Sequence, residues 1–171
     1  LDMQHKLINK IEREIERQRK TGNGHLIFKC NGLTDEEMTA ALYRAAQKDI
    51  ELLLDLDEDL PPINFDREQL KRVFVNLFDN AIQAMNQKGR PWVSTKDDTK
   101  RKRAMVTVAD EGPGIAPEDQ ERLFVPYFTR KKTGTGLGLA IVRRIITDHE
   151  GQIQAGSNHP KGAAFTFDLP V

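Results

Sequence analysis

The chain has 171 residues, a length that fits one domain or one domain with a short appendage. Lys+Arg and Asp+Glu both number 26, so there is no net charge to attract nucleic acid. No apolar run reaches the roughly 18 residues that a membrane span needs. Leu1–Arg19 is charged throughout, which excludes a signal peptide, and the one cysteine cannot form an internal disulfide. A cytoplasmic chain is predicted, whether or not a longer parent protein is attached to a membrane.

The first third of the sequence predicts two helices and two strands. Leu1–Lys20 has a narrow apolar stripe at helical spacing, and His25–Lys29 has the composition of a short strand. Thr34 and Glu37 have the spacing of a capping box, so a second helix is expected to start there. Ile50–Leu56 reads as a strand. We take residues 1–24 as an N-terminal helix with its linker and residues 25–171 as the main domain.

The remainder alternates helices with antiparallel hairpins. Asp66 is expected to begin a helix with Leu70, Val73, Phe74, Leu77 and Ala81 on its buried face. Pro117 suits the first turn of a short helix, and Leu139–His149 is expected to be a helix that Gly151 stops. The predicted strands are Val93–Thr95, Ala104–Ala109, Ile153–Ala155 and Ala164–Leu169. Together they predict an α+β protein, a two-layer α/β sandwich with helices on one face of a mixed sheet.

Basic residues gather in the predicted hairpin tip Asp97–Arg103. A solvated tip is preferred there over a nucleic-acid patch, because the segment is polar and carries both charge signs.

One face of the helix after Asp66 carries amide side chains beside the apolar stripe. At about 100° per residue, Asn76, Asn80 and Gln83 fall on one strip, whereas Asp79 is expected to point away from the apolar stripe. An asparagine oxygen can hold Mg²⁺ while nucleotide phosphates supply the negative charge. The alternative, that these amides only flank the core in contact with water, stays open on this strip alone.

Two glycine clusters follow. Asp110-Glu111-Gly112-Pro113-Gly114 comes directly after a predicted strand, where a carboxylate can accept from an exocyclic amine and glycines admit a flat base. Gly134-Thr135-Gly136-Leu137-Gly138 opens the helix Leu139–His149, where unpaired N–H groups can bind phosphate. It is neither a Walker A loop nor a dinucleotide-binding fingerprint, because the spacings differ. The intervening Ile115–Thr133, with the cations Arg130–Lys132, is a candidate lid.

The four motifs in this order resemble a known family. Asn76…Asn80, Asp110-x-Gly112-x-Gly114, Phe124…Phe128 and Gly134-x-Gly136-x-Gly138 are similar to the N, G1, F and G2 boxes of sensor histidine kinases. These kinases belong to the Bergerat-fold ATPases, with DNA gyrase, Hsp90 and MutL. The segment Pro126–Gly138 is most similar to the nitrogen-regulatory (NtrY/NtrB-like) group.

The resemblance implies ATP and Mg²⁺ as cofactors and a role for each motif. Asp110 is expected to bind the adenine amine, Asn80 with Asn76 to hold the metal and act in catalysis, and the second glycine cluster to line the triphosphate. The full set of expected nucleotide contacts is Asn76, Asn80, Gln83, Asp110, Gly112, Gly114, Ile115, Phe124, Phe128, Arg130, Lys131, Lys132, Gly134, Thr135, Gly136, Leu137, Gly138 and Thr166. Many kinases carry Lys or Arg where this chain has Gln83, so phosphate neutralisation from that helix is not expected.

The resemblance also implies partners. We expect a histidine phosphoacceptor domain and a downstream response regulator as partners. We do not expect this chain to bind nucleic acid or a membrane. Of the four histidines only His5 lies on an upstream helix, and its surroundings lack the acidic residue and proline typical of an acceptor. The phosphate is therefore expected to go to a histidine outside this chain. A homodimer through Leu1–Lys20 stays open beside packing of that helix on its own domain.

A second resemblance concerns the front of the chain. Leu7–Gln47 is similar to a segment of bacterial polyphosphate kinase. Two interpretations stay open: a graft joined near Ala41–Gln47, and a chance similarity of a strand–helix unit. The segment lacks that enzyme's catalytic histidines, so no such activity is expected.

The sequence thus predicts a domain that binds Mg-ATP and donates the γ-phosphate to a separate histidine. Two alternatives stay open: a gyrase- or MutL-like ATP hydrolase, and a recombined or engineered ATP-binding scaffold without kinase activity. Asn76 favours transfer, because gyrase-like members carry a glutamate there as the general base.

Overall fold

The computed structural model of the chain describes residues 53–171, except 56, 58, 87 and 133. The predicted elements Leu1–Lys20, His25–Lys29 and the helix from Thr34 lie outside these residues, as does most of Ile50–Leu56.

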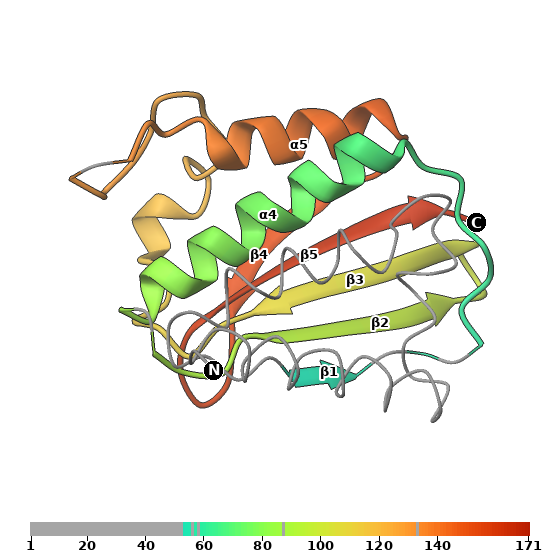
Figure 1. The fold of residues 1–171 in the computed structure, drawn as a ribbon, viewed down its shortest axis with the longest axis horizontal. Helices are drawn as coiled ribbons and strands as arrows, with labels where there is room; N and C mark the ends of the chain where they lie inside the picture. The colour runs from blue at the N-terminus through green and yellow to red at the C-terminus, as the bar shows by residue number, and fades with distance from the viewer. Residues whose placement is uncertain (1–52, 56, 58, 87, 133) are drawn as a thin grey trace, which may run out of the picture.

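The described residues form the predicted two-layer sandwich, in which two long helices cover one face of a five-stranded sheet (Figure 1). The order of the strands across the sheet is β1-β2-β3-β5-β4. β1 pairs in parallel with β2, and the other neighbours are antiparallel, so the sheet is mixed as expected. The strands are β1 (Leu53–Asp55), β2 (Trp92–Asp98), β3 (Arg103–Ala109), β4 (Ile153–Ser157) and β5 (Ala163–Pro170).

The helix α4 (Arg67–Ala84) begins where the sequence predicted. The carboxylate of Asp66 accepts a hydrogen bond from the backbone N–H of Gln69 at 2.9 Å, which caps the first turn. The five residues of the predicted apolar stripe are all buried. Phe74 on this stripe meets Phe167 of β5 edge to face, with ring centroids 6.1 Å apart, and Phe167 is fully buried. The core therefore lies between α4 and the central strands.

The helix α5 (Gly138–Asp148) lies beside α4 and runs back along the same face of the sheet (Figure 1). Its predicted inward residues Val142, Ile145 and Ile146 are buried, and Ile141 is half-buried. Between β3 and α5 there is a single 3-10 turn, η1 (Pro117–Asp119), with the proline at its start as expected. In the described part of the chain, neither α4 nor α5 has the length and apolar character to cross a bilayer.

The end of α5 differs from the prediction. The residue in the left-handed conformation is Glu150, with φ of +60°, rather than Gly151. The N–H of Gly151 donates to the carbonyl of Ile146 at 2.8 Å, but a Cβ at Gly151 would lie 2.1 Å from the carbonyl oxygen of Asp168. Gly151 is needed because β5 passes so closely, and the stop itself falls one residue earlier.

The central hairpin is longer than the sequence suggested. β2 and β3 pair from Trp92 with Ala109 to Asp98 with Arg103, so Asp97, Asp98 and Arg103, which were assigned to the tip, belong to strands. The tip residues Lys100, Arg101 and Lys102 are exposed.

At the edge of the sheet, Leu53 of β1 pairs with Trp92 of β2. Both side chains are partly exposed, at 40% for Leu53 and 38% for Trp92. Among the described strands, the short parallel β1 thus forms the edge of the sheet, and Leu53 and Trp92 are partly open to solvent there.

Candidate functional site

The described residues enclose a cavity of about 910 Å³. It lies where α4 ends and α5 begins, at one end of the sandwich in Figure 1. Most of the predicted site residues line it: Asn76, Asn80, Gln83, Asp110, Gly112, Gly114, Ile115, Phe128, Arg130, Lys131, Gly134, Thr135, Gly136 and Gly138. The fold thus brings all four motifs to one cavity.

Four predicted residues do not line the cavity, and Thr166 is the clearest correction. Phe165 and Phe167 are buried on the helix side of β5, so strand alternation turns Thr166 to the opposite face. There its hydroxyl lies 2.9 Å from the hydroxyl of Thr107 on β3. Thr166 therefore pairs two strands and does not face the cavity.

The other three lie at the border of the site. Phe124 packs on the core, edge to face with Phe165 at a centroid distance of 6.3 Å. Leu137 is the residue before the first turn of α5 and is half-buried. Lys132 is exposed. Phe124 packs against the core, Leu137 is half-buried before α5, and Lys132 faces solvent.

The base end of the cavity is built around Asp110, which directly follows β3 and is only 3% exposed. Its Oδ1 accepts hydrogen bonds from the N–H groups of Gly112 at 2.8 Å and Ala163 at 3.2 Å. No described residue donates to Oδ2. The pKa of this carboxyl is raised, chiefly by burial, while the two backbone donors and the charge of Lys131 oppose the rise. One carboxylate oxygen is thus fixed and the other remains available to a ligand.

Close backbone approaches hold Asp110 in place. A Cβ at Gly112 would lie 2.8 Å from the carbonyl oxygen of Ala84, at the end of α4. Gly162 has φ of +113°, and a Cβ there would lie 1.8 Å from the carbonyl oxygen of Asp110. The side chain of Asn158 donates to that same oxygen at 2.8 Å. Neither Gly162 nor Asn158 was predicted from the sequence, although a glycine directly before the buried strand β5 is a signal of such an approach.

The opposite end of the cavity is the start of α5. No side chain caps this helix, and the Thr135 hydroxyl accepts from the N–H of Leu137 at 3.3 Å. Gly136 has φ of +71°, and a Cβ there would lie 2.5 Å from the backbone of Tyr127, whose N–H donates to the Gly136 carbonyl at 2.9 Å. The glycine cluster therefore gives the backbone a path that other residues could not follow, and it leaves the first N–H groups of α5 open toward the cavity.

The segment between the glycine clusters is braced by an ion pair. Arg130 binds Asp119 through two hydrogen bonds, Nε to Oδ2 at 3.1 Å and Nη2 to Oδ1 at 2.7 Å. The Arg130 hydrogen bond holds the pKa of Asp119 below its usual range. The ring of Phe128 lies under the guanidinium groups of Arg122 at 4.5 Å and Arg130 at 5.7 Å. Arg130 lines the cavity, yet its guanidinium is engaged within the segment.

The amide side chains on α4 face this segment. Lys131 donates from Nζ to Oδ1 of Asn80 at 2.5 Å. Asp79 also lines the cavity, and its charge acts on Lys131. The sequence predicted that Asp79 points away from the apolar stripe, and it did not predict that Asp79 lines the cavity. The helical angle between Asp79 and Asn76, however, is only about 60°. Asn76 reaches the start of α5, where its amide oxygen would lie 3.5 Å from a Cβ at Gly138.

The donors at this end suit a cation only in combination with a ligand. Within the described residues no group of three or more His, Cys, Asp or Glu could hold a metal by itself. Asn76 and Asn80 offer neutral amide oxygens, of the kind that bind Mg²⁺ when phosphates complete the shell. The Asn80 oxygen already accepts a hydrogen bond from the ammonium of Lys131.

Two family models match the chain, one over each of its parts. Residues 65–171 match the family described as "Histidine kinase-, DNA gyrase B-, and HSP90-like ATPase". Residues 1–56 match "Polyphosphate kinase C-terminal domain 2", and these residues lie almost wholly outside the described part.

Among curated relatives, the chain is 38% identical over 141 residues to the signal transduction histidine-protein kinase AtoS of Escherichia coli. It is 40% identical over 150 residues to the sensor histidine kinase ZraS of Salmonella typhi. These matches cover 82% and 86% of this chain but 23% and 32% of the relatives. The chain therefore spans about a quarter to a third of the length of the relatives that it matches.

Solved structures give the same result. The catalytic domain of the histidine kinase ThkA, in a nucleotide-free form, matches with a TM-score of 0.68 and 33% identity, over 79% of this chain and 88% of that one. Full-length ShkA in complex with AMPPNP matches with a TM-score of 0.67 and 31% identity, over 80% of this chain and 30% of that one.

Proposed function

Because the chain belongs to the family of histidine kinase-, DNA gyrase B- and HSP90-like ATPases, we propose that its cavity binds Mg-ATP and presents the γ-phosphate to a histidine on a separate phosphoacceptor domain. The observation that carries the proposal is Asp110, a buried carboxylate that lines the cavity, with one oxygen fixed by backbone donors and no described donor on the other. A carboxylate in this position accepts from the adenine amine and repels the carbonyl of guanine.

The rest of the proposed mechanism is positioning. The open N–H groups at the start of α5 bind the phosphates, supported by the helix dipole and by the backbone path of Gly134, Gly136 and Gly138. Asn80 and Asn76 would hold Mg²⁺, which neutralises developing charge on the transferred phosphoryl group. Residue 76 carries an amide, which cannot take a proton from water, and this favours transfer to an imidazole over hydrolysis.

The proposed partners follow from the same reaction. The recipient is a histidine of a helical dimerisation domain, and a response regulator receives the phosphate next. The match of residues 1–56 to a polyphosphate kinase family supports a further proposal, that the front of the chain is a graft joined to the catalytic domain near Ala41–Gln47.

The first test is calorimetric titration with a non-hydrolysable ATP analogue, with and without Mg²⁺. Binding that strengthens with Mg²⁺ is expected, and the absence of binding at millimolar analogue would sink the proposal. The second test is transfer of labelled γ-phosphate to the isolated phosphoacceptor domain of a similar kinase. An acid-labile phosphohistidine is expected, with little hydrolysis by the chain alone. Rapid steady-state hydrolysis that Asn76→Ala abolishes would instead indicate a hydrolase.

A further inference from the structure

One contact joins the segment Ile115–Lys132 to the opposite wall of the cavity. The ammonium of Lys131 donates to Oδ1 of Asn80 at 2.5 Å, across 51 positions in the sequence. Thr129 shapes the chain just before it, because its hydroxyl accepts from the N–H of Lys131 at 3.0 Å. The contact therefore reaches from a turn of the lid to the middle of the amide strip on α4.

The three neighbouring cations of this segment do different things. Arg130 is engaged by Asp119 inside the lid. Lys132 is exposed and makes no hydrogen bond or ion pair with a described residue. Only Lys131 crosses to α4, so its contact cannot be explained as a general attraction of a basic loop to the cavity.

Two carboxylates act on the Lys131 ammonium. The charges of Asp79 and Asp110 favour its charged form, although burial outweighs them and lowers its pKa. The amide oxygen of Asn80 is the oxygen proposed above for Mg²⁺, and no described side chain other than Lys131 contacts it. Two cations cannot share one amide oxygen at contact distance without strong repulsion.

Building on the proposed function, we propose that Lys131 is a positioning residue that holds the lid to Asn80 in the nucleotide-free protein. Its ammonium takes the place at Asn80 that the metal takes in the complex, so binding of the metal-nucleotide displaces Lys131 and releases the lid. Nucleotide without metal leaves the contact in place. The pair thereby couples lid position to the metal and distinguishes Mg-nucleotide from free nucleotide.

The test uses the full chain without nucleotide. Trypsin cleaves after Arg130, Lys131 and Lys132, so the rate of cleavage there reports how often the lid opens. Asn80→Ala leaves these three sites intact and removes the tether. For an exposed charge-assisted contact, cleavage is expected to accelerate about threefold to fivefold. Gln83→Ala is the matched control. Gln83 lines the same cavity one turn along α4, but it makes no hydrogen bond with Lys131.

Two outcomes would overturn the proposal. Cleavage of Asn80→Ala at the wild-type rate would mean that the contact does not hold the lid. Equal acceleration in Gln83→Ala would mean that any change in α4 loosens the segment. Lys131→Met provides a second measurement. This substitution removes one tryptic site, so amide exchange is measured instead of cleavage, and exchange over residues 129–136 is expected to be faster than in the wild type. If the calorimetric titration shows no nucleotide binding, the proposed function fails, whereas the tether in the nucleotide-free protein is still decided by proteolysis.

Discussion

Asp110 illustrates at the scale of one residue how a binding group is kept at a cost to the fold. Its carboxylate is nearly fully buried at the end of β3, with two backbone donors on one oxygen and none on the other. A buried charge that lacks full solvation raises the free energy of the folded state. A ligand that donates a hydrogen bond to the second oxygen would offset this cost.

Replacement of Asp110 by Asn should therefore separate binding from stability. The amide oxygen can still accept from Gly112 and Ala163, but the charged acceptor for the adenine amine is lost. We expect calorimetric affinity for an ATP analogue to fall about tenfold to a hundredfold. We expect the free energy of unfolding to stay the same or to rise.

The difference in the free energy of unfolding between the wild type and Asp110→Asn should depend on pH, with a definite sign. The folded-state pKa of Asp110 lies above its ordinary value of 3.8, so the folded state resists ionisation. The resulting loss of stability is absent below pH 3.8 and develops as pH rises through the raised pKa. Urea unfolding of both proteins across this range should show the wild type falling relative to Asp110→Asn. A constant difference at all pH values would contradict the assignment of burial as the cause.

At the scale of elements, the lid depends on side-chain contacts because it has almost no regular structure. Its 3-10 turn η1 has three residues, too few for a helix that is stable by itself. Asp119 is buried under the two-point contact from Arg130, and Phe128 lies beneath two guanidinium groups. The segment is thus a small polar and aromatic cluster attached to the sandwich.

Asp119→Asn should loosen this cluster without unfolding the domain. The ion pair stabilises the lid fully above pH 3.8, and its contribution is lost as pH falls through the lowered pKa of Asp119. At neutral pH the Asp119→Asn variant lacks the stabilisation that the ion pair gives to the wild type. We expect amide exchange over residues 119–130 to increase about twofold to fivefold, in line with exposed ion pairs. Glu118→Gln, next to it and exposed, should change exchange little, and equal effects of the two would argue against a specific brace.

The sequence allowed the elements to be predicted better than the contacts between them. The cap at Asp66 and the stripes on α4 and α5 are local patterns. The start of α4 and both ends of α5 fall within a residue of the prediction. The hairpin was predicted too short because Lys96, Asp97 and Asp98 do not resemble a strand, yet pairing with β3 holds them. The roles of Arg130 and Lys131 depend on which distant residue each meets, and no periodicity contains that information.

The error at Thr166 has a different origin. The resemblance suggested a nucleotide contact, while the alternation of Phe165 and Phe167 already placed Thr166 on the other face of the strand.

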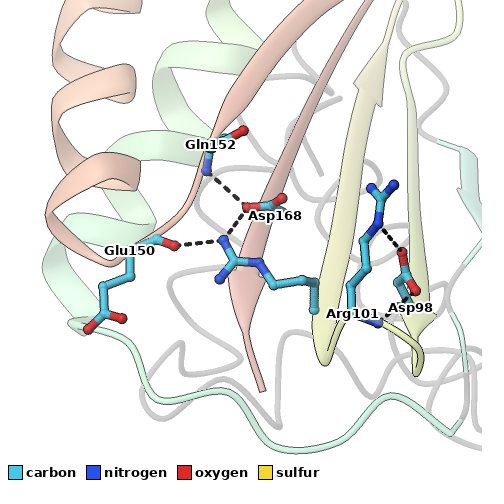
Figure 2. Close-up of polar contacts among 6 residues, drawn as sticks. Asp98, Arg101, Glu150, Gln152 and Asp168 are labelled. Atoms are coloured by element: carbon cyan, nitrogen blue, oxygen red, sulfur yellow. Dashed lines mark hydrogen bonds and ion pairs between the residues drawn. The ribbon is translucent and has the colours of Figure 1, made fainter.

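At the scale of the whole molecule, the end of the sandwich opposite the cavity is closed by a polar clasp. Arg103 at the start of β3 donates to the carboxylate of Asp168 on β5 at 2.5 Å and to the carbonyl of Glu150 at 2.6 Å. The N–H of Gln152 donates to the same Asp168 oxygen at 2.9 Å. Figure 2 shows Asp168 beside Gln152 and Glu150, where α5 turns into β4. The clasp joins the turn between α5 and β4 to the strands β3 and β5.

Gly151 lies inside this clasp and offers a sharp test of its tightness. A Cβ at Gly151 would lie 2.1 Å from the Asp168 carbonyl oxygen, so Gly151→Ala must displace β5 or α5. We expect a loss of about 1–3 kcal/mol in the free energy of unfolding, as for overpacked sites. Gly156→Ala on β4 is the matched control, because nothing lies within 4 Å of a Cβ there. Urea unfolding should show the control unchanged or slightly stabilised.

The half-covered edge of the sheet also provides a spectroscopic consequence. Trp92 is the only tryptophan of the chain, and it pairs with Leu53 of β1 and stands outside the lining of the cavity. Its fluorescence therefore reports the attachment of the edge strand. Emission from Trp92 is expected to follow the melting of that edge and to stay constant while nucleotide is titrated, so one intrinsic fluorophore separates unfolding from ligand occupancy.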